Sequence, residues 1–124
     1  MRDIHRMGWF RLALSLLLSA GAMPAKVRFI RDVKPILEMH CVRCHGNGAA
    51  MKGLRMDTRE RAWMAISKKH PEDSRIYLAS RSRFMPPGDT KLSPGELDTL
   101  RMWILEGAKW PKGVVLEGKN PFLK

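Results

Sequence analysis

The residues with the clearest chemical potential are Cys41, Cys44 and His45, which form the pattern Cys-x-x-Cys-His. They include the only two cysteines of the 124-residue chain. Two thiols at this spacing can add to the two vinyl groups of a haem, and a histidine directly after the second thiol can bind its iron. The pattern therefore predicts one covalently attached haem c, with Cys41 and Cys44 as attachment points and His45 as the proximal iron ligand.

Two haem-free chemistries also fit this pair of cysteines. A Cys41–Cys44 disulfide is reasonable in an oxidising compartment, whereas a thiol-exchange enzyme uses Cys-x-x-Cys in a strand-to-helix context that this sequence lacks. A structural zinc site needs four ligands, so His45 and either His40 or His70 would have to join the cysteines. Both alternatives stay open on the residues alone.

Met85 is the predicted second iron ligand. It follows His45 by 40 residues and lies in the segment RFMPPG, where Pro86 disfavours a helical conformation of the preceding residue. A thioether ligand favours reduced iron and raises the potential, which suits electron transfer. Methionine is usually core filler, so other candidates have to be considered. They are Met51, Met56, Met64, Met102 and, as a chemically different rival, His70. A displaceable sixth ligand would instead indicate a peroxidase-like enzyme or a gas sensor.

The first 25 residues differ in composition from those that follow. A basic start with three arginines precedes an apolar run over 12–22 and then a stretch of small residues. This order is typical of a secretory signal peptide, with cleavage expected after Ala22 or Ala25. The apolar run is short for a membrane span. We therefore expect a periplasmic protein, attached to a membrane only if the segment is not cleaved.

The charge balance narrows the class of partner. The formal net charge is +11 and the isoelectric point is about 10.4. The basic residues are spread along the chain without a Lys/Arg block, a zinc-finger pattern or an aromatic nucleic-acid signature. The sequence therefore favours redox partner proteins with acidic docking surfaces over nucleic acid, and no small-molecule substrate is expected.

Four helical segments are expected to position these residues. They cover 31–41, 57–66, 71–80 and 93–107. Asp32 is the expected cap of the first, Asp57 with Glu60 forms a possible capping box of the second, and Ser93 with Glu96 forms that of the fourth. No strand pattern is convincing, so the predicted fold is all-α with long loops. Such a small domain gains stability from a group bound in its middle.

Four segments resemble the planctomycete-type cytochrome c domain. They are DVKPILEMHCVRCHG, KGLRMDTRE, MPPG and LSPGELDTLRMWILEGAKWP. The resemblance runs from about Val27 to Pro111 and implies a compact helical fold in which helix 31–41 crosses helix 94–106 near the haem edge. It also implies thioether bonds at Cys41 and Cys44, with His45 and Met85 on the iron. We accordingly expect a cytochrome c domain over 26–111 and a tail over 112–124 that matches nothing recognisable.

Together, these features predict an exported monohaem c-type cytochrome. It would carry single electrons between partner proteins and would not itself be an enzyme, because the chemistry belongs to the iron. The haem propionates need charged or hydrogen-bonding partners. The residues considered for that role are Arg55, Arg81, Arg83 and Trp110.

Overall fold

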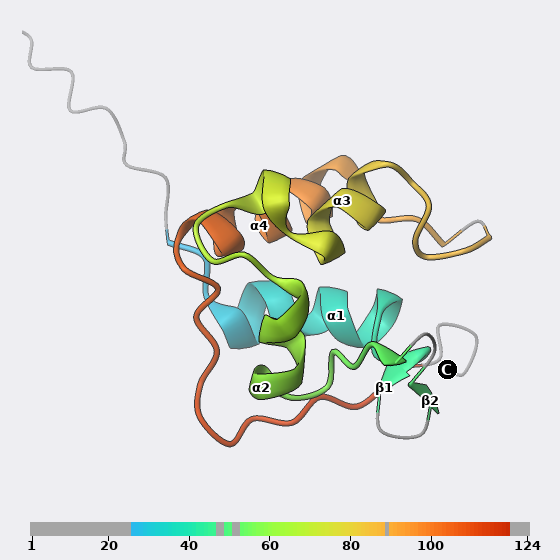
Figure 1. Ribbon diagram of the computed structural model, residues 1–124, viewed down its shortest axis with the longest axis horizontal. Coiled ribbons are helices and arrows are strands. Elements are labelled where there is room, and N and C mark those ends of the chain that lie inside the picture. Colours follow the sequence, from blue (N-terminus) through green and yellow to red (C-terminus); the bar gives the residue numbers. More distant parts are fainter. Residues whose placement is uncertain (1–25, 47–48, 51–52, 89, 120–124) are drawn as a thin grey trace, which may run out of the picture.

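The computed structural model describes residues 26–119 except 47–48, 51–52 and 89. Its elements are η1 (Phe29–Val33), α1 (Lys34–His40), α2 (Arg59–Ala62), η3 (Trp63–Ala65), η4 (Pro71–Asp73), α3 (Arg75–Arg81) and α4 (Pro94–Leu105). Figure 1 shows these helices arranged around α1, with α3 and α4 on one side of it. The predicted all-α fold is confirmed. Within the described part of the chain, no helix has the length and apolar character that a membrane crossing requires.

One short pair of strands was not predicted from the sequence. β1 (His45–Gly46) pairs antiparallel with β2 (Ala49–Ala50) directly after the cysteines. Strands of two residues carry too few side chains to show an alternating pattern. The pair leaves the fold class unchanged, but it fixes the backbone at His45.

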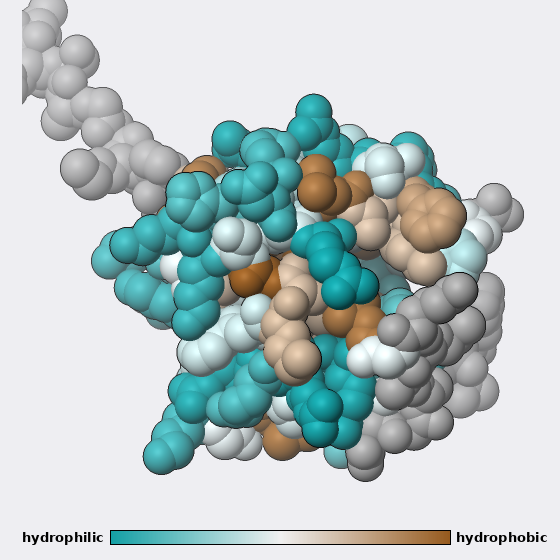
Figure 2. All heavy atoms as spheres, viewed as in Figure 1, coloured by the Kyte–Doolittle hydropathy of each residue, from teal (hydrophilic) through white to brown (hydrophobic). Residues whose placement is uncertain are grey.

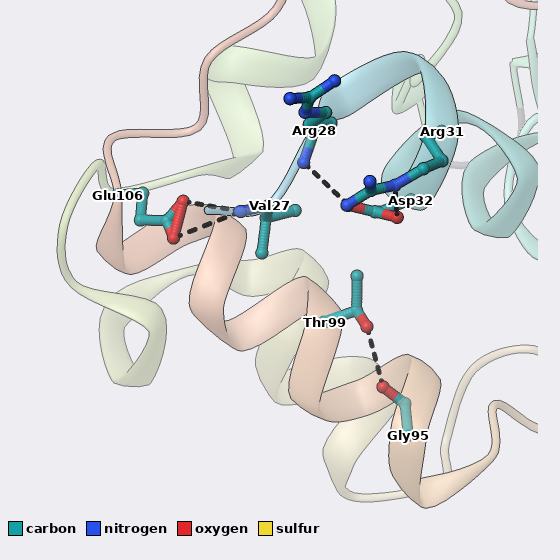
Figure 3. Close-up of polar contacts among 7 residues, drawn as sticks. All are labelled: Val27, Arg28, Arg31, Asp32, Gly95, Thr99 and Glu106. Carbon is teal, nitrogen blue, oxygen red and sulfur yellow. Dashed lines mark hydrogen bonds and ion pairs between the residues drawn. The ribbon is translucent and has the colours of Figure 1, made fainter. Parts of the chain in front are cut away.

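The first helix begins earlier than the sequence indicated. It starts with a π-turn at Phe29 instead of after a cap at Asp32, and the Lys34 N–H bonds to the Phe29 carbonyl five residues back. The Asp32 carboxylate reaches back and accepts from the Arg28 N–H at 2.8 Å (Figure 3). Proline has no N–H to give to a regular helix. The wider turn lies directly before Pro35, which takes the second position of α1.

The last helix forms as predicted. The Ser93 hydroxyl accepts from the Glu96 N–H at 3.1 Å, and the Glu96 carboxylate accepts from the Ser93 N–H at 2.9 Å. This capping box satisfies two of the N–H groups that a helix start leaves unpaired. Pro94 takes the first helical position, as expected.

The core lies where α4 meets η1. Phe29 packs between two tryptophans, with ring centroids 5.9 Å from Trp103 and 4.3 Å from Trp110. The start of the described chain is tied to the end of α4 because the Val27 N–H donates to the Glu106 carboxylate at 3.0 Å (Figure 3). Aromatic packing of this kind supplies much of the apolar burial available to a domain of this size.

The second helix is shorter than predicted and has a different cap. Thr58, and not Asp57, stands at the N-cap of α2, where its hydroxyl accepts from the Arg61 N–H at 3.4 Å. Asp57 is buried and forms an ion pair with Arg55. Because Asp57 lies one residue before the cap, its carboxylate can pair with Arg55 instead of capping the helix. The spacing in the sequence does not distinguish between these two roles.

Residues 112–119 pack against the first helix. The Glu117 N–H donates to the buried Glu38 carboxylate at 2.9 Å, and the Lys119 N–H donates to the Glu38 carbonyl at 2.9 Å. Leu116 is buried, and its N–H donates to the Asp57 carbonyl at 2.8 Å. The boundary at 111 remains a prediction, but these contacts hold the following segment against both α1 and the start of α2.

Burial would raise the pKa of the Glu38 carboxyl, but the hydrogen bonds from Lys34 and from the Glu117 N–H outweigh it and the pKa is lowered. Glu38 is therefore ionised at neutral pH. A buried carboxylate needs such donors, since an unpaired charge away from water is costly. The tail thus supplies one of the donors that make this charge tolerable.

The tail also makes a testable contact at Gly118. A Cβ at this position would lie 2.9 Å from Cα and 3.0 Å from N of Arg43, between the two cysteines. Because neither backbone atom can yield cheaply, Gly118→Ala is expected to lower the free energy of unfolding by about 1–3 kcal/mol, as overpacking does. Urea denaturation measures this change.

Gly95→Ala is the matched control. A Cβ there would meet nothing closer than Ser93 Oγ at 3.9 Å. Alanine is a better helix former than glycine, so this variant should keep or gain stability. Equal stabilities of the two variants would mean that the tail does not rest against the Arg43 backbone.

Candidate functional site

A cavity of about 270 Å³ opens beside the cysteine motif. All four predicted site residues, Cys41, Cys44, His45 and Met85, lie on its wall. The remaining lining residues are His40, Arg43, Leu54, Met56, Arg75, Ile76, Ala79, Ser80, Phe84, Pro86 and Pro87. The wall is mostly apolar, which suits a flat hydrophobic ring. In Figure 2, apolar side chains gather over α3 and the loop that follows it, beside a hollow.

A tight turn at the end of α1 positions both thiols. The Cys44 and His45 N–H groups donate to the Cys41 carbonyl at 3.2 and 2.9 Å. Cys41 itself caps the helix, with its N–H on the Leu37 carbonyl at 2.9 Å. The turn directs both cysteines and His45 to one cavity, which is the arrangement that two vinyl groups and an iron require.

Burial raises the pKa of the Cys41 thiol to about 12, with smaller contributions from Cys44 and Glu96. The thiol is therefore protonated at neutral pH, unlike the low-pKa cysteine that a thiol-exchange enzyme uses as nucleophile. For the zinc alternative, the described residues hold no group of three or more His, Cys, Asp or Glu side chains that could bind a metal ion.

The Leu54 carbonyl is a hydrogen-bond partner of His45 that the sequence did not reveal. It lies 3.2 Å from His45 Nδ1. Donation from Nδ1 to this carbonyl selects the tautomer whose lone pair is on Nε2 and fixes the ring. The Met56 N–H in turn donates to the His45 carbonyl at 2.6 Å. A backbone acceptor carries no side-chain signature, so only the spacing of the KGLRM segment could have pointed to it.

Gly46 fits against the turn because it has no side chain. A Cβ there would lie 2.5 Å from the Val42 carbonyl oxygen and 2.9 Å from a Val42 side-chain carbon. Real Cβ atoms do not approach a backbone atom so closely. The residue after His45 is therefore restricted to glycine by the turn that positions His45.

The loop after α3 brings Met85 to the cavity. The Met85 N–H donates to the Ala79 carbonyl at 3.1 Å, Pro86 is buried, and the Lys91 ammonium donates to the Pro86 carbonyl. These contacts hold both sides of Met85. In Figure 1 this loop follows α3, and β1 lies across from it on the other side of α1.

The rival ligands are placed differently. Met64 is 76% exposed, and neither it nor Met102 lines the cavity. His70 is exposed and also lies away from the lining. Met56 does line the cavity, although it is almost fully buried as core. Met51 lies outside the described residues.

The propionate candidates do not reach the cavity. Arg55, Arg81 and Arg83 are absent from its lining, and the Trp110 indole N–H is used by the Val114 carbonyl at 2.9 Å. The arginines that do line the cavity are Arg43 and Arg75, which the sequence did not single out. All four candidates lie close in sequence to the predicted motifs, but none of them lines the cavity.

Arg55 instead forms a bidentate pair with Asp57. The two nitrogen–oxygen distances are 3.0 and 2.7 Å. The hydrogen bond from Arg55 lowers the pKa of the Asp57 carboxyl below its ordinary 3.8, although burial opposes the shift. This pair stabilises the segment between the Leu54 carbonyl and α2.

Asp57→Asn is expected to make the free energy of unfolding depend less on pH in the acid range. A lowered folded-state pKa contributes stability that is present above the unfolded pKa of 3.8 and is lost as pH falls through the folded pKa. The variant should lose about 1–3 kcal/mol at neutral pH and less at acid pH. Unfolding free energies measured along a pH series test this.

Glu60→Gln is the control, since Glu60 is exposed and pairs with Arg59 at the surface. Its stability should stay close to that of the unchanged protein. If the free energy of unfolding of Asp57→Asn fell with decreasing pH as steeply as that of the unchanged protein, other carboxyls would dominate acid unfolding.

The family model described as Planctomycete cytochrome C matches residues 41–89. The matched span begins at the first cysteine, includes Met85 and contains most of the residues on the cavity wall. No curated protein and no solved structure matches the chain.

Proposed function

Because this chain carries a planctomycete-type cytochrome c domain, and so is a haem-binding cytochrome, we propose that it is an exported carrier of single electrons with one haem c. In this proposal Cys41 and Cys44 form the thioether bonds, and His45 and Met85 are the iron ligands. The observation that carries it is that these four residues line one mostly apolar cavity, although they come from segments 40 residues apart.

The chain's own residues would each have a defined part. Bound haem supplies a one-electron couple at its iron. The Leu54 carbonyl orients His45, while the loop contacts of Met85 and Pro86 hold a thioether at the cavity. Buried apolar side chains of the cavity wall such as Ile76 would exclude water from the ring. A dry site with a thioether ligand favours the reduced iron and a raised potential.

The surface at the cavity mouth supports an acidic partner. Phe84 is 73% exposed and lines the cavity, so it offers an apolar contact at its edge. Arg43 and Arg75 also line the cavity, and the exposed Arg83 directly precedes Phe84 in the loop after α3. Basic side chains around an apolar contact attract acidic proteins and speed their encounter. Partner binding should therefore weaken with increasing salt.

The export part of the proposal rests on the composition of residues 1–25, which the structure does not describe. A basic start, an apolar run and small residues indicate a secretory signal peptide. Periplasmic location would also place the cysteines where haem c is attached.

The deciding experiment is the denatured mass of the protein exported from a host that matures c-type cytochromes. A mass equal to the chain cleaved after Ala22 or Ala25 plus one haem is expected. The same sample should show a reversible one-electron reduction. A mass of the bare chain, or of the chain less two hydrogens, would overturn the proposal in favour of a thiol or disulfide site.

A further inference from the structure

His40 is a buried polar side chain at the cavity that the function described above does not use. It is the last residue of α1, directly before Cys41, and it lines the cavity. Its side chain is 9% exposed. Imidazole is a costly group to bury, so its partners decide which form it takes.

Both ring nitrogens of His40 face oxygen acceptors. Nδ1 lies 3.2 Å from the Thr90 carbonyl oxygen, and Nε2 lies 2.9 Å from the Glu96 carboxylate. A carbonyl can only accept, and a neutral imidazole has only one N–H. If both contacts are hydrogen bonds to unprotonated oxygens, the ring must carry two protons and a positive charge.

Glu96 is arranged to remain the acceptor. Burial would raise the pKa of its carboxyl, but hydrogen bonds from Ser93 and His40 outweigh burial and lower it. Its other oxygen accepts from the Ser93 N–H in the capping box of α4. The carboxylate is therefore charged at neutral pH, and it lies 2.9 Å from His40 Nε2.

The charged and titratable groups around His40 come from every side of the cavity. On the cavity wall they are Cys41, Arg43, Cys44 and His45 in the cysteine turn and Arg75 on α3. Glu96 on α4 contacts the ring, and Lys91 follows Thr90 in the sequence. The Lys91 ammonium is engaged by the Pro86 carbonyl, and Cys41 stays protonated at neutral pH. Among these groups, Glu96 is the one whose side chain contacts the His40 ring directly, at 2.9 Å.

We propose that His40 is a redox-linked proton site and a positioning residue for the Met85 loop. The proposal rests on the haem function proposed above. With haem bound, loss of one electron to a partner would raise the charge in the cavity by one, and the His40 ring that lines the cavity would release one proton to water. Reduction by a partner reverses both transfers. By linkage, protonated His40 raises the potential as much as oxidation lowers the proton affinity of His40.

The positioning part follows from the Thr90 contact. Thr90 lies five residues after Met85, and its carbonyl contacts the ring of His40, the last residue of α1. His40 therefore links the turn that presents the thiols to the loop that presents the thioether. A neutral ring would have to give up one of its two bonds, so proton loss would loosen this link.

The test is the reduction potential of the holoprotein from about pH 5 to about pH 10, a range that brackets histidine titration. The unchanged protein should show a potential that falls with pH, with a slope of up to about 59 mV per pH unit for one proton and one electron. His40→Gln should remove this slope and lower the potential at neutral pH. His70→Gln, which alters an exposed histidine away from the cavity, should behave as the unchanged protein.

Two further measurements separate coupling from a merely structural role. Glu96→Gln removes the charge that favours imidazolium, so the sloping region should move to lower pH. In the unchanged protein, the NMR shift of the His40 ring protons should titrate at higher pH in the reduced than in the oxidised form. A pH-independent potential, or identical His40 titrations in both oxidation states, would overturn the inference. A protein without covalent haem would instead overturn the proposed function.

Discussion

Replacing Met85 with alanine is expected to lower the reduction potential by a substantial part of the about 0.8 V range that axial ligands cover. The thioether would no longer favour the reduced iron. Met85 lines the cavity from a loop whose contacts include the Ala79 and Pro86 carbonyls. Residues 82–92 contain no other methionine that could replace it. The ferrous variant should also bind carbon monoxide without denaturant. Spectroelectrochemistry and carbon monoxide difference spectra measure both effects.

Met64→Ala is the matched control for Met85. Met64 is 76% exposed in η3 and does not line the cavity. Its removal should leave the potential and the carbon monoxide response unchanged. If Met85→Ala kept the original potential, Met56 would be the next candidate, because it lines the same cavity. If the unchanged protein itself bound carbon monoxide readily, the displaceable-ligand alternative would gain support.

The double variant Cys41→Ala, Cys44→Ala is expected to lose covalent haem completely. Both thiols line the cavity, and they are the only cysteines in the chain. Denatured mass spectrometry should give the bare processed chain. The domain should also be much less stable, because a small helical fold with long loops depends on the group in its middle. The unfolding midpoint of purified protein measures the second effect.

Arg43→Ala separates the role of the thiols from that of the turn. Arg43 stands between the two cysteines and lines the cavity, but it cannot form a thioether. This control should retain haem through denaturation. Haem that stays attached in the double alanine variant would contradict both predicted attachment points.

The parts of the fold that sequence reasoning predicted well depend on local side-chain chemistry. The capping box of Ser93 and Glu96 involves two side chains three residues apart, so its geometry follows directly from the spacing. The four predicted site residues were chosen because thiol, imidazole and thioether groups have few other joint uses, and the structure brings them to one cavity. The same logic failed for Asp57, since a carboxylate can serve as a cap or as an ion-pair partner.

The parts that were not predicted depend on backbone groups or on distant contacts. The Leu54 carbonyl that lies against His45 has no side-chain identity, and neither has the Thr90 carbonyl that meets His40. The start of the first helix was misplaced because its π-turn has no residue signature. The cavity arginines Arg43 and Arg75 could not be distinguished from solvated ones before the loops were placed.

The bond between Glu117 and Glu38 has a consequence for the order in which this protein assembles. These residues are 79 positions apart, as are Val27 and Glu106. Contacts that close such long loops form slowly, whereas the turn at Cys41 needs only its neighbours. The cysteine turn can therefore form before residues 112–119 pack behind it. We expect a maturation enzyme to meet the thiols on an open, uncovered turn, and the last segment to close over the product.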